Sequence, residues 1–354
     1  MEATYFKEQI SEIIHQLYEQ PLANLIYHAH ELRMKLHPNN EVTWQIDRNV
    51  NITNVCVSQC MFCNFCRTKN SNEAYITTID EYRRKIEELL SLGGNQLLIQ
   101  GGLHPELGLS FYVNLFSQLK REYPEIKLNA LGPPEIVYLA KKEKKSYEDI
   151  LKTLIDAGLD SLPGAGAEIL SDRVRRILSP AKCSSTEWLD VMRIAHRLGL
   201  VTTATMVFGH IETIEERIQH LLLIKSLQDD KPSGSYGFLN FILWPMQLVG
   251  TRLSKKYNIK PVSISEYVRM LAISRIVLSN IPHIQVSWLT VGKEVAQLCL
   301  HAGANDMGSI MLEENVVSAA GVSKVIMSIE EMKQTIIEAG FIPRRRNQKF
   351  EILD

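Results

Sequence analysis

The sequence has no excess of charge of either sign. Its 354 residues carry 39 Lys and Arg against 40 Asp and Glu, which gives a formal net charge of −1. This balance excludes a generally basic nucleic-acid-binding protein and a strongly acidic tail. We therefore expect no nucleic-acid partner.

Long apolar runs are also missing. The mean hydropathy is −0.07, and no apolar stretch approaches the length needed to cross a bilayer, so we expect no membrane partner. The first residues lack a basic segment followed by an apolar one. We therefore expect no secretory signal and a cytoplasmic protein.

Cysteine is scarce and unevenly placed. Of six cysteines, Cys56, Cys60, Cys63 and Cys66 lie within eleven residues. Such a cluster in a chain that is not exported indicates metal chemistry rather than a disulfide framework. The other two cysteines are isolated, and we expect them to be buried and inert.

The rest of the sequence alternates between strand-like and helical runs. Residues 1–40 contain two apolar helical faces and predict an N-terminal helical extension. Eight short apolar or β-branched runs follow, at residues 42–52, 96–100, 127–131, 161–163, 202–208, 236–244, 284–288 and 304–307. Eight strands alternating with helices predict an α/β fold, a single (β/α)8 TIM-type barrel over residues 41–340. The two N-terminal helices are expected outside it, and residues 341–354 as a C-terminal tail.

Several helix starts carry Ser or Thr three residues before Glu. The pairs are Thr78 and Glu81, Ser184 and Glu187, Thr213 and Glu216, Ser263 and Glu266, and Ser328 and Glu331. In such a capping box each side chain satisfies a backbone N–H of the first helical turn. Five pairs at the expected junctions support one another and the barrel pattern.

Three of the clustered cysteines have a spacing with chemical meaning. Cys56, Cys60 and Cys63 form C-x3-C-x2-C directly after the first predicted strand. Three thiolates can hold three corners of a 4Fe–4S cube and leave the fourth iron open to a ligand. A structural zinc site needs a second Cys or His pair, and a ferredoxin needs a fourth Cys followed by Pro; neither follows here. The motif favours an open cubane and leaves the role of Cys66 undecided.

This motif after the first strand of a barrel, with Phe62 before the third cysteine, resembles the radical S-adenosylmethionine (SAM) superfamily. The resemblance implies that Cys56, Cys60 and Cys63 are the cluster ligands and that SAM binds the open iron. Phe62 then belongs to the cofactor site.

The same resemblance assigns further SAM contacts. Gly101 and Gly102 follow the second predicted strand, where glycine allows a ligand to approach the backbone closely. Glu168 follows the fourth strand and is expected to hold the ribose hydroxyls. The alternative for Glu168 is a first-turn residue that complements a helix dipole.

Longer stretches resemble one subgroup of this superfamily, from about residue 45 to about residue 317. They include Gln100–Pro105, Gly132–Ile136, Ser161–Leu170 and Thr203–His210. The subgroup contains menaquinone enzymes of the futalosine pathway, and the resemblance is greatest to the cyclic dehypoxanthine futalosine synthases. The alternatives are a sister carbon–carbon bond-forming synthase (aminofutalosine synthase or the deazaflavin precursor synthase subunit) and, from another class, an iron–sulfur electron-transfer protein.

The resemblance implies a radical cyclisation in menaquinone biosynthesis. A 5′-deoxyadenosyl radical takes a hydrogen from the 4′ carbon of the sugar of dehypoxanthine futalosine, and the carbon radical attacks the benzoate ring. The ring then loses an electron and a proton. Such an oxidoreductase needs a small-molecule substrate, a dry site at the barrel mouth, a base, and an external one-electron reductant of flavodoxin or ferredoxin type.

Candidate side chains for this chemistry lie where predicted strands end. Glu135 and His210 are the candidate catalytic bases. The candidate substrate-binding residues are His104, Glu212, Trp244, Asn305 and Glu313. The benzoate carboxylate calls for Arg or backbone donors, and Arg67 and Arg173 are candidates. We expect the basic run Arg344–Arg346 to be a solvated part of the tail.

Overall fold

The computed structural model describes residues 2–316, 318–320 and 326–353. Within these residues, ten strands form one parallel sheet in the order β10-β1-β9-β8-β7-β6-β5-β4-β3-β2. The strands are β1 Glu41–Gln45, β2 Asp47–Asn51, β3 Gln96–Gln100, β4 Lys127–Ala130, β5 Leu159–Leu162, β6 Val201–Phe208, β7 Phe238–Pro245, β8 His283–Val286, β9 Asp306–Ser309 and β10 Ile342–Arg345.

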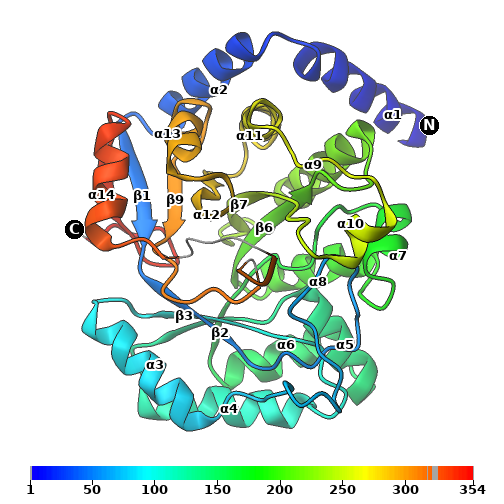
Figure 1. Cartoon of the computed structure of the whole chain (residues 1–354), viewed down its shortest axis with the longest axis vertical. Coiled ribbons are helices and arrows are strands. Elements are labelled where there is room, and N and C mark those ends of the chain that lie inside the picture. Colours follow the sequence, from blue (N-terminus) through cyan, green and yellow to red (C-terminus); the bar gives the residue numbers. More distant parts are fainter. Residues whose placement is uncertain (1, 317, 321–325, 354) are drawn as a thin grey trace.

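Helices alternate with these strands and surround them (Figure 1). They are α1 Glu2–Ile13, α2 Leu22–Leu36, α3 Ile79–Ser91, α4 Leu109–Glu122, α5 Pro133–Glu143, α6 Tyr147–Asp156, α7 Asp172–Leu178, α8 Ser185–Arg197, α9 Ile214–Asp229, α10 Arg252–Lys256, α11 Ile264–Val277, α12 Trp288–Val291, α13 Lys293–His301 and α14 Ile329–Glu338. A π-helical turn, Ile14–Tyr18, follows α1, and a 3-10 turn, Ser318–Ala320, precedes α14. None of the helices in the described ranges is long and apolar enough to cross a membrane.

The sheet closes into a barrel through a single bent strand. β1 pairs with β9 on one side and with β10 on the other, whereas β2 pairs with β3. One residue, Ile46, separates β1 from β2. The two segments therefore act as the first strand of an eight-stranded ring, and β10 is an extra strand beside it. The predicted (β/α)8 barrel is confirmed.

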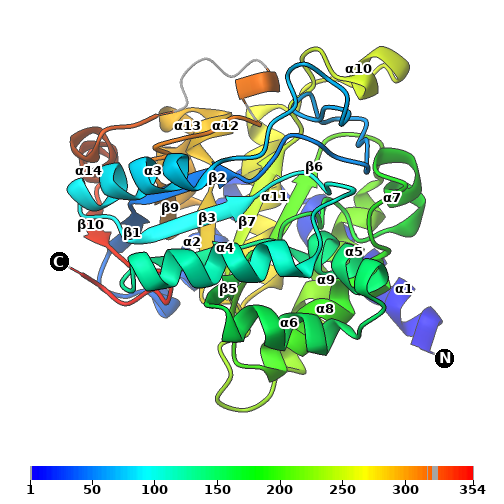
Figure 2. The ribbon, with the colours of Figure 1, turned by 90° about the horizontal axis from the view of Figure 1, so that it is seen from below.

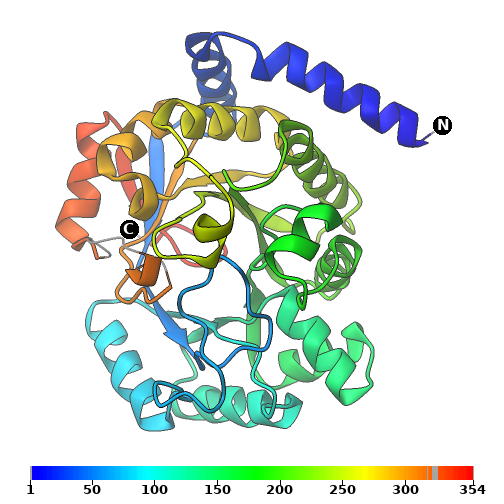
Figure 3. The same cartoon turned by 45° about the vertical axis from the view of Figure 1, so that its right-hand side comes forward.

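The two N-terminal helices lie outside the ring, as predicted. Figure 3 shows α1 and α2 beyond the circle of helices that surrounds the strands. Helix α2 packs against α11 and α13, and its buried Leu25 and Ala29 face that contact. On the other side of the barrel, α3 and α4 run along β2 and β3 (Figure 2).

Four of the five predicted capping boxes are complete. They begin α3, α8, α9 and α14, where both reciprocal hydrogen bonds are present. At the start of α11, Ser263 accepts from the backbone of Glu266, but the Glu266 carboxylate does not return the contact. It accepts instead from Tyr18 and Arg217, so a tertiary contact replaces half of the local motif.

The end of the chain is not a solvated tail. Residues Ile342–Arg345 form β10, which pairs in register with β1. Arg346 is 4% exposed and donates from Nε and Nη2 to both carboxylate oxygens of Asp306, at 2.6 and 3.0 Å. The expectation that Arg344–Arg346 is solvated is wrong for Arg346, because a buried carboxylate on β9 requires a cation.

Candidate active site

A cavity of about 370 Å³ lies inside the barrel. Side chains near the carboxyl ends of the strands make its wall apolar, among them Phe62, Pro163, Trp244, Met246, Leu289 and Met311. Side chains within the strands make its floor polar, among them Asp47, Asn49, Gln96, Asn129, Asn240 and Gln285. The interior of such barrels is normally filled by branched apolar residues. Open space lined by carboxamides therefore indicates a ligand site.

The four clustered cysteines lie in the loop between β2 and α3, next to this cavity. The Sγ of Cys56 accepts from the Leu103 N–H at 3.3 Å and lies 2.8 Å from the Ser58 hydroxyl. A hydrogen bond from Cys66 lowers the pKa of Cys56 to about 5, against the effect of burial. Cys60 is buried, and its pKa is raised chiefly by desolvation.

The cysteines of this loop supply thiolates, which are the usual ligands of iron–sulfur clusters. In the described part of the chain, no three His, Cys, Asp or Glu side chains converge on one metal position. Cys66 differs from the other three, because its Sγ lies 3.3 Å from the carbonyl oxygen of Cys56.

Distant segments hold the cysteine loop in place. The Met61 N–H donates to the carbonyl oxygen of Leu178 at 2.8 Å, and Leu253 N–H donates to that of Met61 at 2.9 Å. Arg252 donates to the carbonyl oxygen of Gln59. Figure 2 shows α10 beside this loop. No local sequence pattern indicates this role of α10, since it depends on a contact almost 200 residues away.

Gly101 and Gly102 lie against the start of the cysteine loop. The Gly102 N–H donates to the Thr53 carbonyl oxygen at 2.9 Å. A Cβ on Gly102 would lie 2.2 Å from the Val55 carbonyl oxygen. Residue 102 must therefore be glycine because the chain approaches itself closely here. This requirement does not depend on a ligand nearby.

Glu168 lies on the cavity wall in a strained backbone conformation. Its φ is +40°, a region that residues other than glycine rarely adopt. Its Oε1 accepts from Lys182 Nζ at 2.9 Å, and its buried Oε2 has no hydrogen-bond partner. Burial favours the neutral acid, but Lys182 and Arg175 lower the pKa of Glu168 below its usual value. Oε2 lies 3.6 Å from Arg175 Nη1, so each carboxylate oxygen has a cation nearby, and Oε2 can still accept a hydrogen bond.

Lys182 is a residue that the sequence did not single out. Besides its contact with Glu168, its Nζ lies 5.6 Å from the centre of the Phe62 ring. Its pKa is raised well above the usual value, because Cys60 and Glu168 outweigh the effect of burial. Lys182 thus places a permanent positive charge between the cysteine loop and the cavity.

Glu135 lies at the start of α5, is not among the residues that line the cavity, and has a buried Oε2 without a hydrogen-bond partner. A Cβ atom built on Gly132 would lie 3.3 Å from this oxygen and 3.1 Å from the Cβ of Ala165. Ala165 lines the cavity. Burial is the main reason why the pKa of Glu135 is raised to about 7. A carboxyl group with that pKa can accept a proton at neutral pH.

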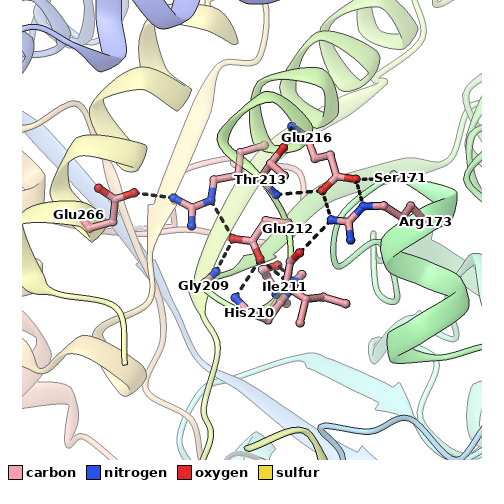
Figure 4. A network of polar contacts seen from close by, with 11 residues as sticks. Ser171, Arg173, Gly209, His210, Ile211, Glu212, Thr213, Glu216 and Glu266 are labelled. Carbon is pink, nitrogen blue, oxygen red and sulfur yellow. Dashed lines mark hydrogen bonds and ion pairs between the residues drawn. The ribbon is translucent and has the colours of Figure 1, made fainter. Parts of the chain in front are cut away.

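His210 and Glu212 contact each other (Figure 4), and neither is among the residues that line the cavity. His210 Nδ1 lies 2.7 Å from Glu212 Oε2, and both side chains are 0% exposed. The other ring nitrogen of His210 lies 3.0 Å from the Val207 carbonyl oxygen. Glu212 also accepts from the Gly209 N–H and from Arg217 Nε, at 2.6 and 2.8 Å. These contacts hold the turn after β6 and occupy the atoms that a base or a substrate contact would use.

Of the other candidate substrate residues, Trp244 lines the cavity. His104 Nδ1 accepts from the Glu106 N–H at 3.1 Å and stabilises its own turn. Asn305 accepts from Arg275 and from the Ile284 N–H, at 2.7 and 3.0 Å.

Three charged candidates are likewise engaged away from the cavity. Glu313 forms ion pairs with Lys85 and Arg48. Arg67 pairs with Glu73 at 2.6 Å, and the half-exposed Arg173 pairs with a carboxylate of α9. None of these side chains reaches the part of the cavity wall that the structure describes.

Two family models match this chain. The radical SAM superfamily model covers residues 50–224, and the model described as the CofH/MqnC C-terminal region covers residues 235–354. A match to the first implies a 4Fe–4S cluster and SAM, and the cysteines between residues 56 and 66 fit these cofactors.

Relatives of known name match almost the whole chain. Cyclic dehypoxanthine futalosine synthase of Streptomyces coelicolor is 41% identical over 95% of this chain and 83% of its own. The enzyme of the same name from Halalkalibacterium halodurans is 39% identical, over 92% and 86%. The 5-amino-6-(D-ribitylamino)uracil–L-tyrosine 4-hydroxyphenyl transferase of Archaeoglobus fulgidus is 38% identical over 92% of both chains.

Solved structures share the fold. Methylornithine synthase aligns with a TM-score of 0.71 over 96% of this chain and 94% of its own, at 17% identity. The FeFe-hydrogenase maturase HydG of Carboxydothermus hydrogenoformans aligns with a TM-score of 0.70, over 97% and 81% of the two chains, at 16% identity. The cysteine loop, the barrel and these relatives agree on one assignment. The chain belongs to the radical SAM superfamily, and within it to the carbon–carbon bond-forming synthases that carry a CofH/MqnC C-terminal region.

Proposed function

We propose that this enzyme converts dehypoxanthine futalosine into cyclic dehypoxanthine futalosine, a step in menaquinone biosynthesis. The observation that carries the proposal is the match over nearly full length to two relatives of that name. The cavity supports it, because an apolar wall and a polar floor suit a substrate with an aromatic ring and a sugar.

The cofactors would bind at the mouth of the barrel. Cys56, Cys60 and Cys63 would hold the cluster, and Phe62, Gly101, Gly102 and Glu168 would surround SAM. When bound and reduced, these cofactors supply the 5′-deoxyadenosyl radical that removes a hydrogen from the substrate. An external reductant of flavodoxin or ferredoxin type would provide the electron.

The chain itself would bind, orient and protect the substrate. Trp244 and the other apolar side chains of the wall exclude water from the place where a reactive radical forms. Holding the sugar carbon within reach of the adenosyl group lowers the entropic part of the barrier. The residues of the wall therefore contribute positioning rather than acid–base chemistry.

Glu135 would accept the proton that the ring loses after cyclisation. Its buried Oε2 has no partner, and its pKa of about 7 leaves a large fraction of the carboxylate ionised at neutral pH. His210 was the other candidate, but its two ring nitrogens contact Glu212 and the Val207 carbonyl oxygen. We therefore assign the base role to Glu135.

A second candidate reaction is supported by the archaeal relatives, which are up to 38% identical. They are named for the transfer of a 4-hydroxyphenyl group from tyrosine to 5-amino-6-(D-ribitylamino)uracil. The two reactions differ in their substrates while sharing the fold and the cofactors.

Anaerobic turnover distinguishes the two reactions. The reconstituted, reduced enzyme is incubated with SAM and either dehypoxanthine futalosine or the pair of tyrosine and 5-amino-6-(D-ribitylamino)uracil. We expect a product two hydrogens lighter than dehypoxanthine futalosine by mass spectrometry, and no condensed product from the pair. The reverse result favours the second reaction. Failure to cleave SAM to 5′-deoxyadenosine would favour the alternative of an iron–sulfur electron-transfer protein.

A further inference from the structure

The segment after β10, residues 346–353, lies across the amino end of the barrel. Figure 2 shows it at the end from which β2 and β3 start. The Leu353 N–H donates to the Arg345 carbonyl oxygen at 2.8 Å, so the segment folds back on β10. Three of its residues, Arg346, Gln348 and Phe350, line the active-site cavity. Part of the cavity wall is therefore built by residues outside the strands of the ring.

A second cavity, of about 170 Å³, lies at the same end of the barrel. His283 and Asn305, at the starts of β8 and β9, contribute to its wall. Leu36 and Ile352 also line it and are 39% and 46% exposed, so this cavity meets the surface. Among the residues that the structure describes, Phe350 alone lines both cavities. Phe350 therefore stands between the active-site cavity and the solvent.

Two contacts fix the ring of Phe350. The ring stacks on that of His283, with 3.7 Å between the ring centres and 11° between the planes. The guanidinium carbon of Arg346 lies 3.8 Å from the centre of the Phe350 ring, and Arg346 is itself held by Asp306. Aromatic stacking and a cation–π contact both favour a defined ring position. The ring is thus anchored by β8 and by a buried ion pair.

The backbone of Phe350 is strained. Its φ is +62°, in the left-handed region that a bulky residue rarely adopts. The Phe350 N–H donates to the Asn347 carbonyl oxygen at 3.1 Å, which holds this turn. Glycine would adopt the same conformation without strain, but it would leave no ring between the cavities. A strained aromatic residue at this position indicates that its side chain has a function.

A cavity in which a carbon radical forms must be closed to small hydrogen donors. The O–H bond of water is too strong to give a hydrogen atom to such a radical, but the S–H bond of a thiol is weak enough. In that reaction the S–H bond breaks, a C–H bond forms on the substrate, and a sulfur-centred radical leaves. The substrate is regenerated, and one SAM is consumed without product. An opening at the amino end would allow this loss, because the proposed cofactor site is at the other end.

We propose that Phe350 seals the active-site cavity at the amino end of the barrel and keeps small thiols from the substrate radical. Its role is protective rather than catalytic, since its ring contacts His283 and Arg346. The inference needs the radical chemistry of the superfamily but not the identity of the substrate. It therefore goes beyond the proposed reaction.

The test compares Phe350→Ala with wild type during anaerobic turnover in heavy water. A protein reductant, SAM and dehypoxanthine futalosine are supplied, with or without 2-mercaptoethanol, whose S–H exchanges to S–D. We expect the thiol to lower the ratio of cyclic product to 5′-deoxyadenosine about threefold or more in Phe350→Ala, and to leave the wild-type ratio unchanged. Mass spectrometry should find one carbon-bound deuterium in the unreacted substrate of the variant.

Thiol size and matched variants separate a channel from a loosened fold. Glutathione is too large for the space that one ring leaves, so it should have no effect on Phe350→Ala. Phe350→Met, which fills most of that space, should behave as wild type. Phe111→Ala is the matched control, since Phe111 is also half-buried, contacts Tyr112 on α4 and lines neither cavity. It should show no thiol effect.

The outcomes separate the seal from the proposed reaction. An equal ratio with and without 2-mercaptoethanol in folded Phe350→Ala, without deuterium in the substrate, would overturn the seal. The same loss with glutathione would also overturn it, because the whole barrel would then be open. If Phe350→Ala does not fold, Phe350→Val carries the same comparison. If wild type forms no cyclic product, the proposed reaction fails, and the seal is tested by the deuterium in 5′-deoxyadenosine made with tyrosine and 5-amino-6-(D-ribitylamino)uracil.

Discussion

A Cβ atom on Gly102 would lie 2.2 Å from the carbonyl oxygen of Val55 and 2.8 Å from the Cβ of Cys56. Cys56 is the first of the three predicted cluster ligands. The glycine after β3 and the cysteine loop after β2 are thus fitted to each other. Any side chain at residue 102 must push the loop away, because backbone atoms cannot yield as a flexible side chain can.

We therefore expect Gly102→Val to lose iron as well as SAM binding. If Gly102 served only to let SAM approach the backbone, this variant would keep its cluster and lose SAM binding, but the contact with Cys56 couples the two. Iron content per chain after anaerobic reconstitution is the measurement. Gly108→Ala is the control, since its Cβ meets the flexible side chain of Glu143 at 2.7 Å. A fully loaded Gly102→Val protein would contradict the prediction.

Cys66 should be dispensable for the cluster. Its thiol lies 3.3 Å from the Cys56 carbonyl oxygen, so it serves the loop as a hydrogen-bond donor. We expect Cys66→Ala to retain iron, whereas Cys56→Ala, Cys60→Ala and Cys63→Ala each lose most of it. Iron and sulfide analysis with electron paramagnetic resonance of the reduced protein decides this. Loss of the cluster in Cys66→Ala with retention in Cys56→Ala reverses the assignment.

Removal of the base should uncouple hydrogen abstraction from product formation. Glu135→Gln cannot take the proton, so 5′-deoxyadenosine should still form with substrate while cyclic product falls at least tenfold. In the wild type, the ratio of product to 5′-deoxyadenosine should rise with pH and reach half its maximum near 7, the pKa of Glu135, because the base acts when deprotonated. An unchanged ratio in Glu135→Gln would pass the role to water or another group.

Glu212 should make the fold sensitive to acid. Although burial opposes it, the contacts with His210, Arg217 and the Gly209 N–H lower the pKa of Glu212 from 4.5 to about 2. A depressed pKa stabilises the fold above pH 4.5, and this contribution is lost as pH falls from about 4.5 to 2. Its size is on the order of 3 kcal/mol.

The measurement is urea unfolding of wild type and Glu212→Gln between pH 3 and 7. Glu212→Gln should be less stable at neutral pH, and the difference from wild type should shrink toward pH 3. The same comparison for the exposed Glu8→Gln should show no such convergence. A constant difference across this range would mean that the carboxylate acts through packing rather than charge.

Loss of the Arg346 guanidinium should destabilise the barrel. Arg346→Met leaves the buried Asp306 without its cation, and removing one partner of a buried ion pair typically costs about 3–5 kcal/mol. Denaturant unfolding should show this loss, with a much smaller effect for Lys349→Met on the exposed part of the same segment. The double variant with Asp306→Asn should recover part of the stability, since the uncompensated charge is gone.

Local sequence signals were sufficient for most elements of the barrel. Residues 96–100 are a strand in both the prediction and the structure. This apolar run lies between the glycines that end one helix and a turn, and it is too short to form a helix. Thr78 and Glu81 cap α3 as predicted, since a capping box uses atoms three residues apart. The strand at residues 342–345 was missed, because its pairing with β1 is about 300 residues distant and its own residues are basic.

The sequence by itself determined the alternation of strands and helices, the helix caps and the spacing of Cys56, Cys60 and Cys63. These depend on neighbours along the chain. Tertiary structure alone decided which side chains face the cavity. It turned His210 toward Glu212, brought Lys182 to Glu168, and gathered Asn49, Gln96 and Asn240 from three strands. The physical reason is that closing a barrel fixes the register of every strand, and register determines which alternate residues point inward.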